Sequence, residues 1–340
     1  EWNDANNALV GRGLSVVTLG YILRFLDFFA LLIQTESDPF PVRPEVADWL
    51  NSIFVILRQF APILQGAFSP AERRAMMDAL GQAGSQYRWR VYEHGLSETF
   101  TPLAAQEIQS FLALTRQYVE HSLRANRRPD SLYHAYNILR LNEGEARVDH
   151  LYEMLEGQVS ILSSGLLAAE ESLQLLRSLR HSALYRSDQH TYILYPDKSL
   201  PGFLEKNTLS PQEVGRLQLP ALLAERGDTS LFTRDTNGQF HFSGHVRNAR
   251  DVRQSLEALQ TEPEIASLVQ AESKDILDLF ERMFQHAEFT GRSGSFFAYE
   301  GLGSVYWHMV AKLLLAAQET TQRFEKHPLG LELRAIYEEI

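Results

Sequence analysis

The chain has 340 residues, of which 44% are hydrophobic, and its formal net charge is −11 at pH 7 with a sequence pI near 5.5. This hydrophobic fraction is that of a globular protein and excludes a disordered chain. The acidic balance repels phosphate backbones, so nucleic acid is not an expected partner. Cysteine is absent, which excludes disulfides, thiolate metal sites and cysteine nucleophiles.

The most apolar stretch, residues 14–33, is predicted to be a helix that is buried on most sides. Arg24 and Asp27 lie near its middle, and charged groups are costly at the centre of a bilayer, so a membrane partner is not expected. The residues ahead of this helix already form a motif. We therefore expect a fragment that lacks its beginning, and the missing N-terminal region of the same polypeptide is the expected protein partner.

Helical periodicity dominates the rest of the chain. Apolar residues step by three and four along residues 46–64 and 108–122, and the pattern returns at residues 150–162, 167–181, 263–286 and 304–324. Ser69 and Ser210 each precede a proline and stand three residues before a glutamate, which marks a helix start. Strand-like runs are few, at residues 191–195 and 239–242.

The predicted fold class is all-α, with one or two short strands in a loop-rich stretch at residues 184–245. Nearly all-apolar helices alternate with amphipathic ones, which suits a two-layered helical toroid. An irregular helical bundle is the alternative, and periodicity does not separate the two. We expect one domain over residues 1–340, with residues 184–245 as an insertion within it.

A candidate general acid opens the chain, in the run Glu1-Trp2-Asn3-Asp4. A carboxylate beside an indole at the mouth of a buried helix is partly desolvated. Desolvation raises a carboxyl pKa, so that the group can hold its proton near neutrality. Asp4 fits this role, although an aspartate just before a helix also serves as an N-cap.

The run Trp2-Asn3-Asp4-Ala5-Asn6-Asn7, followed by Gly11-Arg12-Gly13-Leu14-Ser15 and an aromatic-rich helix, resembles the catalytic-acid segment of the cellobiose and chitobiose phosphorylase family. The resemblance implies that this helix is an inner helix of an (α/α)6 barrel, of which the chain would hold a part. It implies that Asp4 protonates the glycosidic oxygen and that Trp2 and Asn3 line the sugar site. Glu1 stands where the family often has aspartate.

Two later stretches continue the resemblance in the same order. Residues 151–165 look like a family helix that carries a glutamine, here Gln158, and ends in Ser-Gly. Residues 301–308 resemble the segment that helps to hold phosphate. Val305 stands where the phosphorylases carry a glutamine, and valine cannot donate a hydrogen bond to phosphate.

The glycines near residue 300 also have a physical interpretation. Backbone N–H groups at the start of a helix favour an anion, and Gly303 allows a ligand to approach the backbone. Arg292, Ser304 and His308 add side-chain donors, so these four residues are the candidate phosphate site. The alternative is a tight glycine-rich turn in which the side chains are simply packed.

Aromatic residues beside polar groups are candidate sugar contacts, because sugars offer an apolar face and paired hydroxyls. The alternative is that these aromatics close helix ends. Glutamates 153, 156 and 300 are candidate bases for hydrolysis. His241 and His245 have no evident third ligand, so a metal is not expected. The candidate sugar contacts are Arg88, Tyr133, His134, Tyr136, Asn137 and Gln158, and the candidate catalytic residues are Asp4, Glu156 and Glu300.

We therefore expect inverting phosphorolysis of a β-linked disaccharide or oligosaccharide, with inorganic phosphate as co-substrate, no cofactor and a cytoplasmic location. An inverting hydrolase remains open, with Asp4 and a glutamate base whose carboxyl groups lie roughly 6.5–9.5 Å apart. A helical module that binds sugar or protein without turnover also remains open. The enzyme hypotheses predict that Trp2, Asp4, Tyr136, Glu156 and Glu300 converge on one concave surface.

Overall fold

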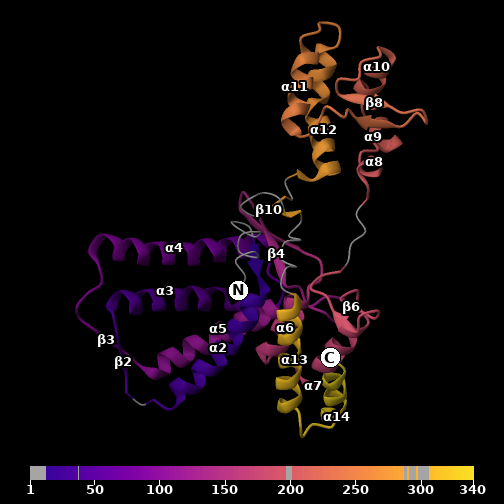
Figure 1. Cartoon of the computed structure of the whole chain (residues 1–340). Coiled ribbons are helices and arrows are strands. Elements are labelled where there is room, and N and C mark those ends of the chain that lie inside the picture. Colours follow the sequence, from indigo (N-terminus) through magenta and orange to yellow (C-terminus); the bar gives the residue numbers. More distant parts are fainter. Residues whose placement is uncertain (1–12, 37, 197–200, 287–288, 291–295, 298–305) are drawn as a thin grey trace. The chain divides into compact units, whose positions relative to one another are not determined.

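The computed structural model describes residues 13–36, 38–196, 201–286, 289–290, 296–297 and 306–340. The chain divides into two compact units: unit 1 comprises residues 1–197 and 301–340, and unit 2 comprises residues 198–300 (Figure 1). The described residues are mostly helical, as predicted, and their strands form small antiparallel sheets of two or three strands. No closed barrel or toroid is identified among them.

Unit 1 contains three pairs of packed helices. Helices α2, α6 and α13 pack side by side in that order, and each also packs against a second helix that lies later in the chain. The pairs are α2 (Val16–Gln34) with α5 (Ala105–Ala125), α6 (Leu155–Ser164) with α7 (Ala169–Arg180), and α13 (Tyr306–Arg323) with α14 (Gly330–Glu339).

Local sequence accounts for the ends of these helices. The Ser15 hydroxyl caps α2 by accepting the Thr18 N–H at 3.1 Å. Helix α6 ends at Gly165, whose φ of 82° lies in the left-handed region that glycine adopts without strain. The Glu171 carboxylate reaches back to the Ala168 N–H at 3.1 Å and closes the start of α7.

Helices α2 and α6 differ in burial. Nine of the ten residues of α6 are buried, because α2 and α13 cover it on both sides. Only six of the 19 residues of α2 are buried, although the helix itself is where the sequence predicted it. The expectation that α2 is buried on most sides was wrong for the described residues, because Phe25, Phe28 and Leu31 are each more than half exposed.

A three-stranded sheet in unit 1 was not predicted. It consists of β1 (Gly13–Ser15), β4 (Tyr136–Asn142) and β5 (Glu145–His150), in the order β1-β4-β5. Gly144, with a φ of 73°, makes the tight turn between β4 and β5. Charged residues fill much of this hairpin, and they hid its alternating pattern. A further hairpin pairs β6 (Tyr185–Arg186) with β7 (Thr191–Tyr192), where residues 191–195 had predicted a strand.

Between α2 and α5, within unit 1, the chain forms an inserted segment whose two ends pair as a two-stranded sheet. Strand β2 (Phe40–Val42) pairs with β3 (Thr101–Leu103), and the segment between them forms α3 (Pro44–Phe60), the 3-10 helix η1 (Ala61–Gln65) and α4 (Pro70–His94). We call residues 40–103 the helical arm (Figure 1). Ser69 and Glu72 form the predicted capping box of α4, and Arg73 donates to the Ala146 carbonyl of β5 at 2.7 Å.

Unit 2 has a hydrophobic core of its own. The rings of Phe232 and Phe280 both pack on Phe242 with centroid distances of 5.0 Å. The helix start at Ser210 and the strand near residues 239–242 are confirmed. Its elements are α8 (Phe203–Lys206), α9 (Pro211–Val214), α10 (Leu219–Glu225), β8 (Phe232–Arg234), β9 (Phe240–Phe242), α11 (Ala249–Gln260), α12 (Ala266–Phe284), β10 (Phe289–Thr290) and β11 (Phe296–Phe297).

Candidate functional site

The starts of α2 and α6 meet at one short backbone segment, residues 133–137. The Ala135 carbonyl accepts hydrogen bonds from the first N–H groups of α2, those of Val16 at 2.9 Å and Val17 at 3.3 Å. On the α6 side, a Cβ at Gly157 would lie 2.8 Å from the Tyr133 carbonyl oxygen, so only glycine permits this approach. The segment therefore joins the two helix N-termini.

A buried carboxylate lies at this junction. The Tyr136 hydroxyl donates to the Glu156 carboxylate at 2.5 Å, and both residues are 2% exposed. Glu156 occupies the first turn of α6, where the helix dipole favours negative charge. The pKa of the Tyr21 hydroxyl on α2 is raised by burial and, next in size, by the charge of Glu156. Tyr136 and Glu156, both predicted site residues, thus lie in contact.

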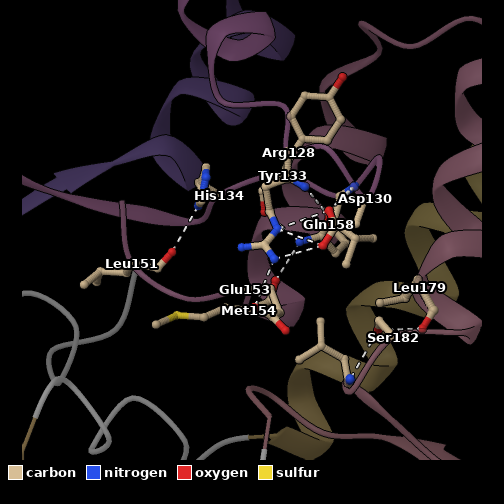
Figure 2. A network of polar contacts seen from close by, with 12 residues as sticks. Arg128, Asp130, Tyr133, His134, Leu151, Glu153, Met154, Gln158, Leu179 and Ser182 are labelled. Atoms are coloured by element: carbon tan, nitrogen blue, oxygen red, sulfur yellow. Dashed lines mark hydrogen bonds and ion pairs between the residues drawn. The ribbon is translucent and has the colours of Figure 1, made fainter. Parts of the chain in front are cut away.

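Gln158 holds the same backbone segment in place (Figure 2). Its side-chain oxygen accepts the Tyr133 N–H at 2.9 Å, and its amide nitrogen donates to the carbonyls of Tyr133 at 2.8 Å and Met154 at 2.9 Å. Gln158 is 0% exposed. Its carboxamide thus bonds to both the N–H and the carbonyl of Tyr133, as the backbone of a paired strand would.

Two stacked histidines also hold residues 133–137 in place through hydrogen bonds. The rings of His134 and His150 lie 4.1 Å apart at an interplanar angle of 7°. His134 Nδ1 donates to the Leu151 carbonyl at 3.0 Å, and His150 Nδ1 donates to the Asn137 side-chain oxygen at 2.8 Å. Burial first, and then the charges of His150 and Arg128, lower the pKa of His134 to about 4, so this imidazole is neutral at pH 7.

Asn137 continues this chain of hydrogen bonds. Its amide donates to the Asn126 side-chain oxygen at 2.7 Å, and both residues are buried. The side chain therefore links the end of α5 to the stacked histidines. Asn137, like Gln158, is engaged with the protein itself.

Glu153, one of the three glutamates considered as a base, forms an ion pair. Arg128 contacts Glu153 at 3.2 Å and Asp130 at 2.9 Å (Figure 2). The Asp130 carboxylate also accepts the Leu132 N–H at 3.1 Å. Ser131 between them has a φ of 67°, so this ionic network fixes a tight turn directly before residues 133–137.

Other predicted site residues lie elsewhere or outside the described residues. Arg88 is exposed on α4, and it follows Arg73 by 15 residues, which is about 22 Å along a helix. It belongs to the helical arm and not to the Tyr136–Glu156 pair. His308 is exposed in the first turn of α13. Outside the described residues lie Trp2, Asn3, Asp4, Arg292, Glu300, Gly303 and Ser304.

Sequence reasoning missed three residues of this junction: Tyr21, Asn126 and His150. Tyr21 lies in an apolar helix without any local polar pattern, so only the approach of α6 reveals it. His150 was hidden because β5 had not been predicted. Within the residues that the structure describes, no group of three or more His, Asp or Glu side chains has a metal-binding arrangement.

Residues 200–287, most of unit 2, match the family described as GH149 phosphorylase insertion domain 2. No curated protein matches the chain. GH149 is a glycoside phosphorylase family that is distinct from the cellobiose and chitobiose phosphorylases, so the expected class of enzyme is supported, whereas the particular family suggested by the first motif is not. Residues 200–287 are therefore similar to a domain of the GH149 glycoside phosphorylase family, and this similarity implies a context of carbohydrate phosphorolysis.

Proposed function

We propose that this chain belongs to the catalytic part of an inverting phosphorylase that cleaves a β-linked disaccharide or oligosaccharide. The match of residues 200–287 to a phosphorylase insertion domain carries this proposal. In the proposed reaction Asp4 protonates the leaving glycosidic oxygen while inorganic phosphate attacks the anomeric carbon from the opposite face. Phosphate is the nucleophile, so a protein base is not required.

The proposed fold is part of an (α/α)6 barrel. Helices α2, α6 and α13 would be inner helices, and α5, α7 and α14 would be their outer partners. The side-by-side packing of α2, α6 and α13, each also packed against its proposed outer partner, supports this assignment. In this scheme the helical arm is inserted between α2 and α5, and unit 2 is inserted between α7 and α13.

The candidate residues take distinct roles in the proposed site. Tyr133 and His134, at the junction of α2 and α6, support the sugar site, and Trp2 and Asn3 are proposed to line it. The carboxylate of Glu156, oriented by Tyr136, accepts a hydrogen bond from a sugar hydroxyl. Because their side chains are fully engaged with the protein, Gln158 and Asn137 position the segment that carries Tyr136.

The proposed phosphate site combines Arg292, Gly303, Ser304 and His308. The position of His308 in the first turn of α13 supports it, since backbone N–H groups at a helix start attract anions. Arginine adds a fork of donors that fits phosphate oxygens.

An inverting hydrolase is the second candidate, because Glu156 supplies a buried carboxylate at the proposed site. In that mechanism Glu156 activates water, and its replacement removes the base. The carboxylate is already bonded to Tyr136 at 2.5 Å, which favours a fixed acceptor over a water-activating base.

The assay that separates the two measures turnover of β-linked disaccharides and oligosaccharides by the complete enzyme with and without inorganic phosphate. Phosphorolysis predicts a glycosyl-1-phosphate product, and it predicts that Asp4→Asn abolishes turnover. Glu156→Gln should then raise KM more than it lowers kcat. Equal turnover in phosphate-free buffer, with free sugar as the sole product, would overturn phosphorolysis and favour the hydrolase.

A further inference from the structure

An ion pair connects the two segments that carry Tyr136 and Glu156. Arg128 lies in the turn directly before residues 133–137, and Glu153 stands three residues before Glu156. The Arg128 guanidinium contacts the Glu153 carboxylate at 3.2 Å (Figure 2). The pair therefore links the backbone segment of Tyr136 to the residues that lead into α6.

On the side of Tyr136, Arg128 is held firmly within its turn. Its backbone N–H donates to the Leu132 carbonyl at 2.8 Å, and its carbonyl accepts the Ser131 N–H at 3.1 Å. Its guanidinium also donates to the Asp130 carboxylate, from Nε at 3.1 Å and from Nη2 at 2.9 Å. Because both the backbone and the side chain of Arg128 are bonded within the turn, its guanidinium has a fixed position relative to the residues that follow.

On the side of Glu156, Glu153 is attached to a packed helix start. The next two residues, Met154 and Leu155, are both 0% exposed. The Leu155 N–H donates to the Leu194 carbonyl at 2.8 Å, which satisfies a donor that a helix start leaves without an intrahelical partner. Glu156 occupies the first turn of this helix, so a displacement of Glu153 also displaces the carboxylate of Glu156.

The pair is less exposed than a typical surface pair of this chain. The side chains of Arg128 and Glu153 are 19% and 21% exposed, whereas those of Arg147 and Glu145 on β5 are 59% and 38% exposed. Water screens the attraction between two charges less as they become buried, so this contact restrains its two segments more than an exposed pair would. Arginine suits the position because its planar fork contacts Asp130 and Glu153 at the same time, whereas lysine offers a point charge.

We infer that Arg128 is a positioning residue of the proposed reaction, which acts through Glu153 to set where the Glu156 carboxylate lies relative to Tyr136 and to the bound sugar. The inference rests on the proposed function, in which a sugar hydroxyl donates to Glu156. It assigns Arg128 and Glu153 to substrate recognition without a contact to the substrate. It also gives Glu153 a role other than that of a catalytic base.

Removal of the arginine charge tests the inference in the complete enzyme. Arg128→Gln should raise KM for the β-linked substrate by about 3- to 10-fold and change kcat less, because a displaced carboxylate binds the sugar less well. Arg147→Gln, at the exposed pair on β5, is the matched control and should leave both constants within about 2-fold. Kinetic constants of Arg128→Gln that equal those of the control would overturn the inference.

A double-mutant cycle with Glu156→Gln separates positioning from general stabilisation. Two residues that act through the same contact are not additive. Arg128→Gln should therefore change KM by less than about 2-fold in an enzyme that already carries Glu156→Gln. A pair that only stabilises the fold would raise KM by the same factor in both backgrounds, and that result would reject the inference.

Glu153→Gln gives a second variant for the case in which Arg128→Gln does not fold. It leaves Arg128 paired with Asp130 and removes only the link to α6. It should raise KM by the same factor as Arg128→Gln, and the two changes together should do no more than either one alone. A KM for Glu153→Gln equal to that of the unsubstituted enzyme would contradict the inference.

Phosphate dependence is measured on the unsubstituted enzyme, so failure of the proposed reaction is distinguishable from failure of the inference. Amide hydrogen exchange tests the positioning without turnover: Arg128→Gln should speed exchange at residues 133–137 and 155–158, whereas Arg147→Gln should not. Unchanged exchange would overturn the inference even in a phosphate-dependent enzyme. Faster exchange together with the KM change, in an enzyme that releases only free sugar, would sustain the inference and reject phosphorolysis.

Discussion

Unit 2 and the helical arm are both segments inserted between helices of the row α2–α6–α13 and their partners, yet they are stabilised in different ways. Unit 2 has a core of sixteen buried hydrophobic residues, all from its own sequence. The helical arm has three buried residues, Glu45, Leu57 and Ala83. Its stability therefore depends on contacts between two long helices, on caps and on the bonds that fasten its base.

Long, well-capped helices do not by themselves make a domain. Helix α4 of the arm begins with a full capping box, and so does helix α9 of unit 2, so the two segments do not differ in how their helices are capped. Burial of apolar area stabilises a fold more than capping does, because a cap contributes only about 1 kcal/mol per helix end. Unit 2 should accordingly fold by itself, and the arm should not.

The largest effect is expected in the core of unit 2. Phe242→Ala should lower the free energy of unfolding of the isolated segment 201–286 by about 3–5 kcal/mol, because it removes a ring that packs on Phe232 and Phe280. Chemical denaturation followed by far-UV circular dichroism measures the change. Phe203→Ala, at a position 63% exposed, is the control and should change the value by less than about 0.5 kcal/mol. A segment without a cooperative transition would show that unit 2 is not self-sufficient.

Two glycines extend the contrast to the candidate site and the arm. Gly157→Ala should destabilise the chain by about 1–3 kcal/mol, because its Cβ would lie 2.8 Å from the Tyr133 carbonyl oxygen. Gly81→Ala in α4 meets nothing within 4 Å and should stabilise the chain by up to about 1 kcal/mol through its higher helix propensity. Thermal unfolding of the two variants compares them, and equal shifts in Tm would contradict the close approach of α6.

A fall in pH should reduce the stability of the candidate site, through His134, more than that of the helical arm. The pKa of His134 is lowered from 6.5 to about 4, so the unfolded chain binds its proton more tightly. The stability that the neutral ring contributes is present above pH 6.5 and is lost as the pH falls towards 4. His134→Gln should flatten the dependence of the unfolding free energy on pH across that window. His94→Gln, an exposed histidine of the arm, is the control, and an unchanged slope in His134→Gln would reject the assignment.

The smallest effect is expected from a surface ion pair of the arm. Asp48 and Arg90 lie 2.6 Å apart, and their side chains are 65% and 47% exposed. Solvent screening reduces such a pair, so Asp48→Ala should cost less than about 1 kcal/mol, and added salt should shrink the difference further. Urea denaturation at low and high ionic strength tests this. A loss of more than about 2 kcal/mol in the free energy of unfolding would mean that this pair stabilises the arm far more than an exposed ion pair should.

How far the site could be predicted differs from residue to residue. The sequence pattern pointed to Tyr136 and Glu156 separately, as an aromatic beside polar groups and as a glutamate within a family-like helix. Their contact joins residues 20 positions apart and depends on Gly157 and Gln158 bringing α6 onto residues 133–137. Arg88 satisfied the same pattern of an aromatic beside a donor, yet it lies on the arm, because composition around a residue does not say which elements approach it.

The features that could be read from the residues alone were local: the helices from their apolar periodicity and the starts at Ser69 and Ser210 from capping chemistry. A motif suggested the class of enzyme, which the match of residues 200–287 supports. Tertiary structure decided which apolar helix is buried. Both α2 and α6 are apolar, but α6 lies between two neighbours, whereas α2 keeps Phe25 and Phe28 exposed. The physical reason is that periodicity and capping act within one or two turns, whereas burial depends on which distant segments pack against the helix.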